Sequence, residues 1–201
     1  MSDPARRHPI RALRDEPFRR VVLRGRMTRP YWRRRFMRFG DGSILHRPDW
    51  IYGPHKISIG NGVVIMKSIW LSAEKVAWAR ADPVISIGNG VAIRPYCTIS
   101  GSESVVIEDD VVVAAFSTII DSDHVHGGGN IVWGGRSAVS PIHIGRGTWI
   151  GERVAVLRGT TIGQFCTIGA NSVVRGEIPD YSVAVGAPAR VVGSTREDVG
   201  P

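Results

Sequence analysis

Aliphatic residues recur at every sixth position in the C-terminal half of the chain. Glycine follows the aliphatic residue in four of these six repeats, whose first positions are Ile144, Ile150, Val156, Ile162, Ile168 and Val174. An α-helix cannot keep this register, because six residues advance a helix by about 1.7 turns. The pattern therefore predicts short strands joined by turns.

The same unit occurs earlier in the chain. Two Ile-Gly-Asn-Gly segments begin at Ile59 and Ile87, and after a two-residue insertion the register continues through Ile107, Val113 and Ile119. The register breaks at residues 66–84 and 120–141. Gly, Asn and Asp at the corners tolerate positive φ. Three hexads would complete one triangular turn, and turns would stack at a strand spacing of about 4.8 Å.

Charge is distributed unevenly along the chain. The net charge is +8, and residues 1–50 hold 14 of the 26 Lys and Arg but only 5 of the 18 Asp and Glu. The remaining residues, 51–201, therefore carry a net charge of −1. In the densest segment, residues 29–38, pairs of aromatic or Met side chains are interleaved with arginines. This segment predicts a basic helix that packs its apolar side on the coil, or one that contacts an anionic membrane or lipid-linked substrate. Nucleic acid is a less favoured partner, because no recognised nucleic-acid motif accompanies the charge.

Other features narrow the class of protein. No stretch approaches the roughly 20 apolar residues that span a bilayer, and no apolar run near residue 1 suggests a signal peptide. We therefore expect a cytoplasmic protein, with a membrane-peripheral location as the extension of the basic-helix hypothesis. Cys97 and Cys166 lie among apolar residues of the repeats, which predicts two reduced core thiols.

Four stretches resemble the hexapeptide-repeat acyltransferase superfamily, and in particular its sugar and polysaccharide O-acetyltransferase branch. They are the segment 119–126, the segment 141–151, the hexad ladder that ends at Val174, and the segment 178–190 with its Gly-x-Pro-Ala-Arg ending. The resemblance covers roughly residues 40–192. It implies a left-handed parallel β-helix, a homotrimer, and acyl-CoA bound in the cleft between neighbouring subunits.

The expected organisation follows from the repeat and the resemblance. We expect an all-β chain with a basic, partly helical extension at residues 1–40 and the β-helix at 41–175. The tail at 176–201 would close the coil. The Gly-rich segment 120–141 is expected to be an extruded active-site loop, since loops of this length in a compact domain are usually functional.

The resemblance implies that a histidine on this loop is the general base. Alignment with the family motif favours His124, and His126 is the second candidate. Both would lie on one side of an extended segment, so the sequence separates them poorly. Asp121, Asp123 or a backbone carbonyl could accept the second ring N–H of the base and fix its tautomer.

The donor predicted from the resemblance is acetyl-CoA, with no metal. Alternation places Trp149 outward, where the family sets an aromatic side chain against the pantetheine arm. Arg175 and Arg190 correspond to residues that serve the coenzyme phosphates, and Arg suits this role through its bidentate fork. The chain departs from the galactoside-type members at Tyr96, near the position of an Asn that contacts sugar, which weakens any transfer of their acceptor preference.

Three functions follow from these residues. The first is acetyl transfer to a hydroxyl of a sugar or glycan precursor, with an amino or non-sugar acceptor as a variant. The second is a zinc hydratase of the γ-carbonic-anhydrase kind, which would recruit His124, His126 and His143. The third is a non-catalytic β-helical scaffold, against which the histidine in the loop argues. The identity of the acceptor does not follow from the sequence.

Overall fold

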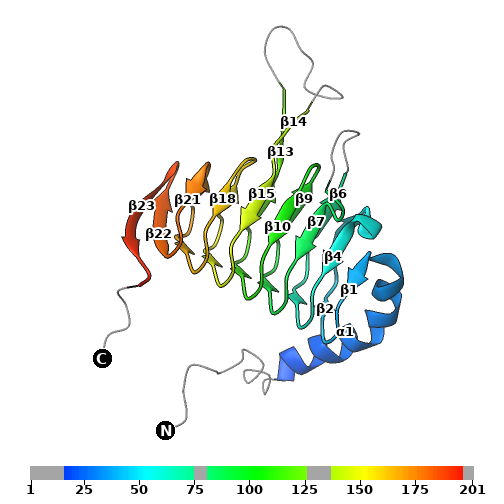
Figure 1. The fold of residues 1–201 in the computed structure, drawn as a ribbon. Coiled ribbons are helices and arrows are strands. Elements are labelled where there is room, and N and C mark those ends of the chain that lie inside the picture. Colours follow the sequence, from blue (N-terminus) through cyan, green and yellow to red (C-terminus); the bar gives the residue numbers. More distant parts are fainter. Residues whose placement is uncertain (1–15, 75–80, 126–136, 197–201) are drawn as a thin grey trace.

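A three-sided coil of parallel strands makes up most of the molecule (Figure 1). The computed structural model describes residues 16–74, 81–125 and 137–196. In the described residues, each rung of the coil except the last gives one strand to each of three sheets, which we name A, B and C in the order in which the chain visits them, and the last rung gives strands to sheets A and B. Strands of successive rungs pair in parallel, so each sheet is one wall of the coil.

The strands are short, as a six-residue unit requires. Sheet A contains β1 (Arg38–Phe39), β4 (Ile57–Ile59), β7 (Ile85–Ile87), β10 (Val105–Ile107), β15 (Ile142–Ile144), β18 (Thr161–Ile162) and β21 (Glu177–Ile178). Sheet B contains β2 (Ile44–Leu45), β5 (Val64–Ile65), β8 (Ala92–Ile93), β11 (Val112–Val113), β16 (Trp149–Ile150), β19 (Thr167–Ile168), β22 (Ser182–Gly186) and β23 (Ala189–Ser194). Sheet C contains β3 (Trp50–Tyr52), β6 (Trp70–Ala73), β9 (Thr98–Gly101), β12 (Thr118–Ile120), β17 (Ala155–Val156) and β20 (Val173–Val174).

The predicted inward register is confirmed. Every aliphatic residue assigned to it is at most 2 % exposed. Parallel pairing aligns these residues from rung to rung, so that Ile107 lies between Ile87 and Ile144 in sheet A. Cys97 and Cys166 are free and buried in the same core, as predicted. The apolar column inside the coil is therefore continuous across the insertion at 120–141.

The prediction that the register breaks at residues 66–84 is wrong for the first residues of this range, which include β6. Leu71 stands six residues after Ile65, is fully buried in β6 and pairs with Ile99 of β9. The register therefore continues through the second rung and is interrupted only after β6. Leu71 is followed by serine and not by glycine, so the Ile-Gly pair does not mark this strand.

The glycine of the Ile-Gly unit has a role that differs from the expected one. A Cβ added to Gly60 would lie 2.5 Å from the carbonyl oxygen of Gly88, and one added to Gly145 would lie 2.5 Å from the carbonyl carbon of Gly163. These glycines thus allow the backbones of stacked rungs to approach each other. Positive φ occurs at other corner positions, several of which carry large side chains such as Tyr96 and Phe116.

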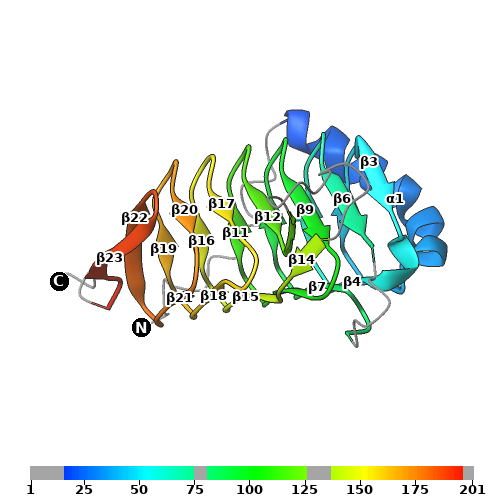
Figure 2. The same cartoon turned by 90° about the horizontal axis from the view of Figure 1, so that it is seen from above.

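Two elements cover the ends of the coil. Helix α1 (Glu16–Arg35) lies at the N-terminal end and contacts β1 and β2, and Figure 2 shows it running beside the first rungs. At the other end, β23 folds back antiparallel on β22. Coil strands run from Arg38 to Gly186, so they begin three residues before the expected 41–175 and end eleven residues after it. The element η2 (Pro54–Lys56) is a short 3₁₀ turn. Within the described ranges, no helix has the length and apolar character needed to cross a membrane.

Candidate active site

A two-stranded hairpin leaves the coil at the edge between sheets C and A (Figure 1). It follows β12 and consists of β13 (Ser122–His124) paired antiparallel with β14 (Ser137–Val139). His124 ends β13, lies opposite Ser137 and is exposed. The second predicted base, His126, lies outside the described residues. The sequence thus located the excursion correctly, and the hairpin pairing explains how its first and last residues are held.

Asp121 anchors the base of this hairpin. Its side chain is fully buried, and its carboxylate accepts backbone N–H bonds from Ser102 at 2.7 Å, Glu103 at 2.8 Å and Ser104 at 2.9 Å. Its backbone carbonyl accepts a further bond from the N–H of Ser140, at the far end of the hairpin, at 2.9 Å. Asp121 therefore joins both ends of the hairpin to the corner of the preceding rung. These bonds satisfy the oxygens of the buried carboxyl group.

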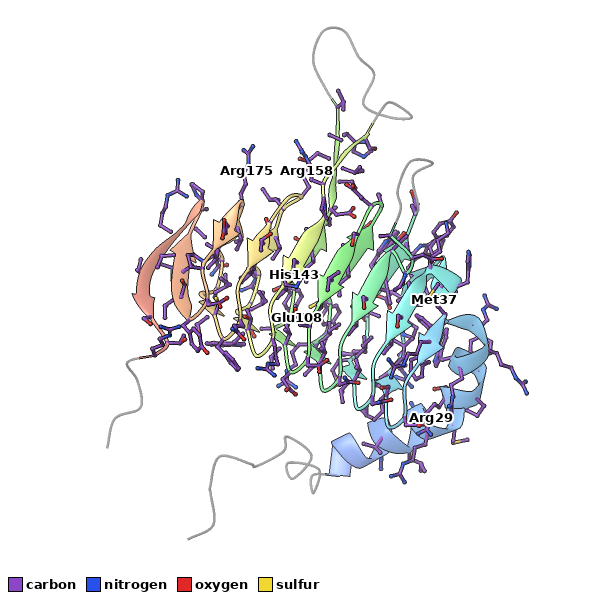
Figure 3. The ribbon with its side chains drawn as sticks, in the orientation of Figure 1. Arg29, Met37, Glu108, His143, Arg158 and Arg175 are labelled. Carbon is purple, nitrogen blue, oxygen red and sulfur yellow. The ribbon has the colours of Figure 1, made fainter. Side chains whose placement is uncertain are left out.

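Asp123 holds the hairpin from the other side. Its Oδ2 accepts a 2.7 Å bond from Nε of Arg158, which stands at the sheet C–sheet A corner of the next rung. Figure 3 shows Arg158 on the edge from which the hairpin projects. Successive side chains of a strand point to opposite faces, so His124 lies on the face of the ribbon opposite to Asp123. Arg158 carried no signal in the sequence, because its partner lies 35 positions away.

The predicted coenzyme residues are divided between two sides of the coil. Trp149 points outward from sheet B and is 52 % exposed, which confirms the orientation expected from alternation. Arg190 lies in β23 of the same sheet, where its Nη1 donates to the carbonyl of Ala189 at 2.9 Å. Arg175 instead follows β20 and projects from the sheet C–sheet A edge, beside Arg158 in Figure 3.

This division separates the predicted base from Trp149. In a three-sided coil, sheet B is the wall opposite the edge between sheets C and A. One chain therefore places His124 and Arg175 on one side, and Trp149 and Arg190 on the other. A site that uses all four residues requires more than one copy of the chain.

His143 has a partner on the outer face of sheet A. Its Nε2 lies 2.9 Å from Oε1 of Glu108, and Figure 3 shows the two side chains meeting between adjacent strands. Glu108 Oε2 also accepts the backbone N–H of Arg146 at 2.9 Å. In residues 16–74, 81–125 and 137–196, no three His, Cys, Asp or Glu side chains are grouped closely enough to hold a metal ion.

Comparison with known families identifies the repeat. Residues 141–176 match the model described as bacterial transferase hexapeptide (six repeats). This part of the chain is therefore similar to the hexapeptide repeat of bacterial transferases. The matched residues run from the end of the hairpin through β15 to β20, the most regular part of the coil.

Two known proteins share substantial sequence identity with part of this chain. A probable acetyltransferase of Mycobacterium tuberculosis is 49 % identical over 89 residues, which are 44 % of this chain and 30 % of that protein. A candidate lipopolysaccharide biosynthesis O-acetyl transferase of Escherichia coli is 39 % identical over 110 residues, 50 % of this chain and 55 % of that protein. The aligned part of the chain thus spans between about a third and a half of these relatives.

A solved structure shares the fold of this chain. A mutant of AntD, an N-acyltransferase from Bacillus cereus in complex with dTDP and coenzyme A, superposes with a TM-score of 0.68. The superposition covers 85 % of this chain and 90 % of that chain, at 18 % sequence identity. The predicted left-handed parallel β-helix is thereby confirmed.

Proposed function

We propose that this protein transfers an acetyl group from acetyl-CoA to a hydroxyl of a sugar or glycan precursor, with His124 as the general base. One observation carries the proposal: an exposed histidine ends a strand of a hairpin that the coil anchors at both sides. The match to a transferase repeat and the two relatives named as acetyltransferases support this reaction class.

The proposed reaction is a direct transfer. The imidazole of His124 takes the proton of the acceptor hydroxyl as its oxygen attacks the thioester carbonyl, and histidine is the side chain that most often serves as a general base. A new C–O bond forms, the C–S bond breaks, and the coenzyme leaves as the thiol with the proton. Asp121 and Asp123 act as positioning residues, since their contacts hold the hairpin that carries the base.

The geometry favours a site shared between copies. His124 and Arg175 lie at the sheet C–sheet A edge, whereas Trp149 and Arg190 lie on sheet B. We propose that in a homotrimer the hairpin of one copy faces sheet B of a neighbour. Trp149 would cover the pantetheine arm, and the two arginines would bind the phosphates of the coenzyme.

The acceptor class rests on the Escherichia coli relative, whose name is that of a candidate O-acetyl transferase of lipopolysaccharide biosynthesis. We therefore propose that the acceptor group is a hydroxyl and that the protein acts in polysaccharide biosynthesis, with an amino group as the alternative acceptor. We also propose that the reaction takes place in the cytoplasm. Contact of residues 1–40 with an anionic membrane is a separate proposal and is argued below.

Thiol release tests the reaction. Purified protein is incubated with acetyl-CoA and a panel of hydroxyl and amino sugars, nucleotide sugars and lipid-linked glycans, and free coenzyme is measured. We expect acceptor-dependent release that falls by about 100-fold or more in His124→Ala, while coenzyme binding persists. His126→Ala is the matched control. If His126→Ala abolished transfer and His124→Ala did not, the assignment of the base would be wrong.

Mixed oligomers test the shared site. Trp149→Ala and His124→Ala variants are each expected to have low activity alone. Subunits of the two variants are then mixed under conditions that allow exchange. A site formed between copies regains activity in mixed trimers, because some interfaces then hold both wild-type residues. Light scattering checks the trimer, and a monomer that is active at the assay concentration would contradict the model.

A further inference from the structure

Helix α1 carries an exposed apolar stripe that the coil does not use. Leu23, Met27 and Tyr31 are 62 %, 75 % and 52 % exposed. They are spaced four residues apart, so they follow one another along one face of the helix. Large apolar side chains that are this exposed and contiguous indicate a surface that contacts a partner.

The opposite face of α1 fixes the helix to the coil. Trp32 packs against the core cluster, and its ring lies 5.7 Å from that of Phe36, which is buried. Gly25 lies so close to the first rung that an added Cβ would be 2.5 Å from Cγ2 of Ile44. The orientation of α1 is thus determined by packing, and the apolar stripe points away from the coil.

Arginines surround the stripe. Arg20, Arg24, Arg26, Arg34 and Arg35 are all exposed, and the guanidinium of Arg35 lies 5.4 Å from the centre of the Tyr31 ring. Within the described part of the chain, only Arg29 and Arg33 of this helix form ion pairs, and both do so with Asp41. Figure 3 shows Arg29 at the N-terminal end of the coil, away from the hairpin. The five arginines are therefore available to an anionic partner.

We propose that this face of α1 lies flat on an anionic lipid surface. Apolar side chains in a row between arginines fit the boundary where acyl chains meet phosphate headgroups. A second copy of the chain is a poor occupant, because it would bring a second set of arginines against the first. The charge of the face selects an anionic surface, and the stripe distinguishes a bilayer from a soluble polyanion. This inference is independent of the proposed acyl transfer.

Vesicle sedimentation of the full chain tests the proposal. Vesicles of phosphatidylcholine with and without phosphatidylglycerol are compared at 0.1 M and 1 M salt, where the Debye length falls from about 10 Å to about 3 Å. We expect binding to the anionic vesicles at low salt, with at least about tenfold weaker binding at high salt or to neutral vesicles. Equal binding to both vesicle types, or none to either, would overturn the proposal.

Two variants separate the contributions of the face. Leu23→Ser/Met27→Ser/Tyr31→Ser removes the stripe, and Arg20→Gln/Arg24→Gln/Arg34→Gln removes charge; all these residues are exposed. Each is expected to weaken vesicle binding by at least about tenfold. Val191→Ser/Val192→Ser and Arg94→Gln/Arg196→Gln are matched exposed controls on the coil and should bind like the wild type. The lipid proposal would be wrong if the stripe variant bound anionic vesicles as well as the wild type does. It would also be wrong if heparin displaced the protein from sedimenting vesicles as effectively as added anionic vesicles do, because the surface would then be a general polyanion site.

Discussion

Nε of Arg158 lies 2.7 Å from Oδ2 of Asp123, and this contact joins the hairpin to the rung that follows it. Both side chains are partly exposed, at 35 % and 57 %. Ion pairs in such positions contribute about 0–1 kcal/mol to stability. The main consequence of the contact is therefore positional: it restrains the strand that ends at His124.

Arg158→Gln should lower activity more than it lowers stability. We expect kcat to fall about tenfold, because a loosened hairpin misplaces the base, while the melting temperature and the KM for acetyl-CoA change little. Thiol-release kinetics and thermal unfolding measure both quantities. Arg94→Gln, at an exposed corner of the coil, is the charge-matched control. If the swapped variant Asp123→Arg/Arg158→Asp has a kcat close to that of the wild type, this would support a positioning role of the contact between the two side chains. An unchanged kcat in Arg158→Gln would contradict that role.

Asp121→Asn should destabilise the fold itself. The fully buried carboxylate of Asp121 accepts hydrogen bonds from three backbone N–H groups. In Asn, an NH₂ group replaces one of the two oxygens and faces at least one of these N–H groups, so that hydrogen bond is lost. Loss of a buried hydrogen bond costs about 1–3 kcal/mol. Chemical denaturation measures the change. Asp110→Asn is the matched control, since Asp110 is an exposed corner residue with positive φ, which Asn also adopts readily.

The sequence predicted the coil well because its determinant is local. A six-residue register of aliphatic residues defines which side chains face inward, and burial of Ile144, Ile150 and Val156 follows from it. The predicted register was incomplete, because it left out Leu71 and the first rung, whose Phe39 and Leu45 are also buried. The position of the hairpin was also predictable, because it interrupts this register directly after β12.

The contacts within the candidate site were not predictable, because they join residues far apart in the chain. Asp121 meets residues 102–104, and Asp123 meets Arg158, through the stacking of rungs. The family pattern named Trp149 and His124 but could not show that they lie on opposite sides of one chain. That separation appears only once each strand is assigned to a wall of the coil.

Cys97 should react slowly with thiol reagents in the folded protein. Burial raises the pKa of its thiol from 9.0 to about 11. Since the thiolate is the reactive form, the shift leaves about 100-fold less of it near pH 8. We expect labelling with iodoacetamide at this pH to be at least about 100-fold slower in buffer than in denaturant. Mass spectrometry of the labelled peptide measures the rate, and Cys97→Ser identifies the signal. Rapid native labelling would show that the core opens at this rung.

Stability should decrease in mild acid because of His46, next to helix α1. Burial lowers the pKa of His46 from 6.5, and nearby Arg47, Arg24 and Lys67 lower it further. The folded state therefore favours the neutral ring, while the unfolded chain binds a proton at its ordinary pKa. Stability is then fully present above pH 6.5 and is lost as the pH falls from there toward the lowered pKa. The melting temperature of His46→Gln should depend less on pH between 7.5 and 5 than that of the wild type. His55→Gln, which changes an exposed histidine on η2, controls for the general loss of a histidine. An equal acid dependence in wild type and His46→Gln would show that other groups cause it.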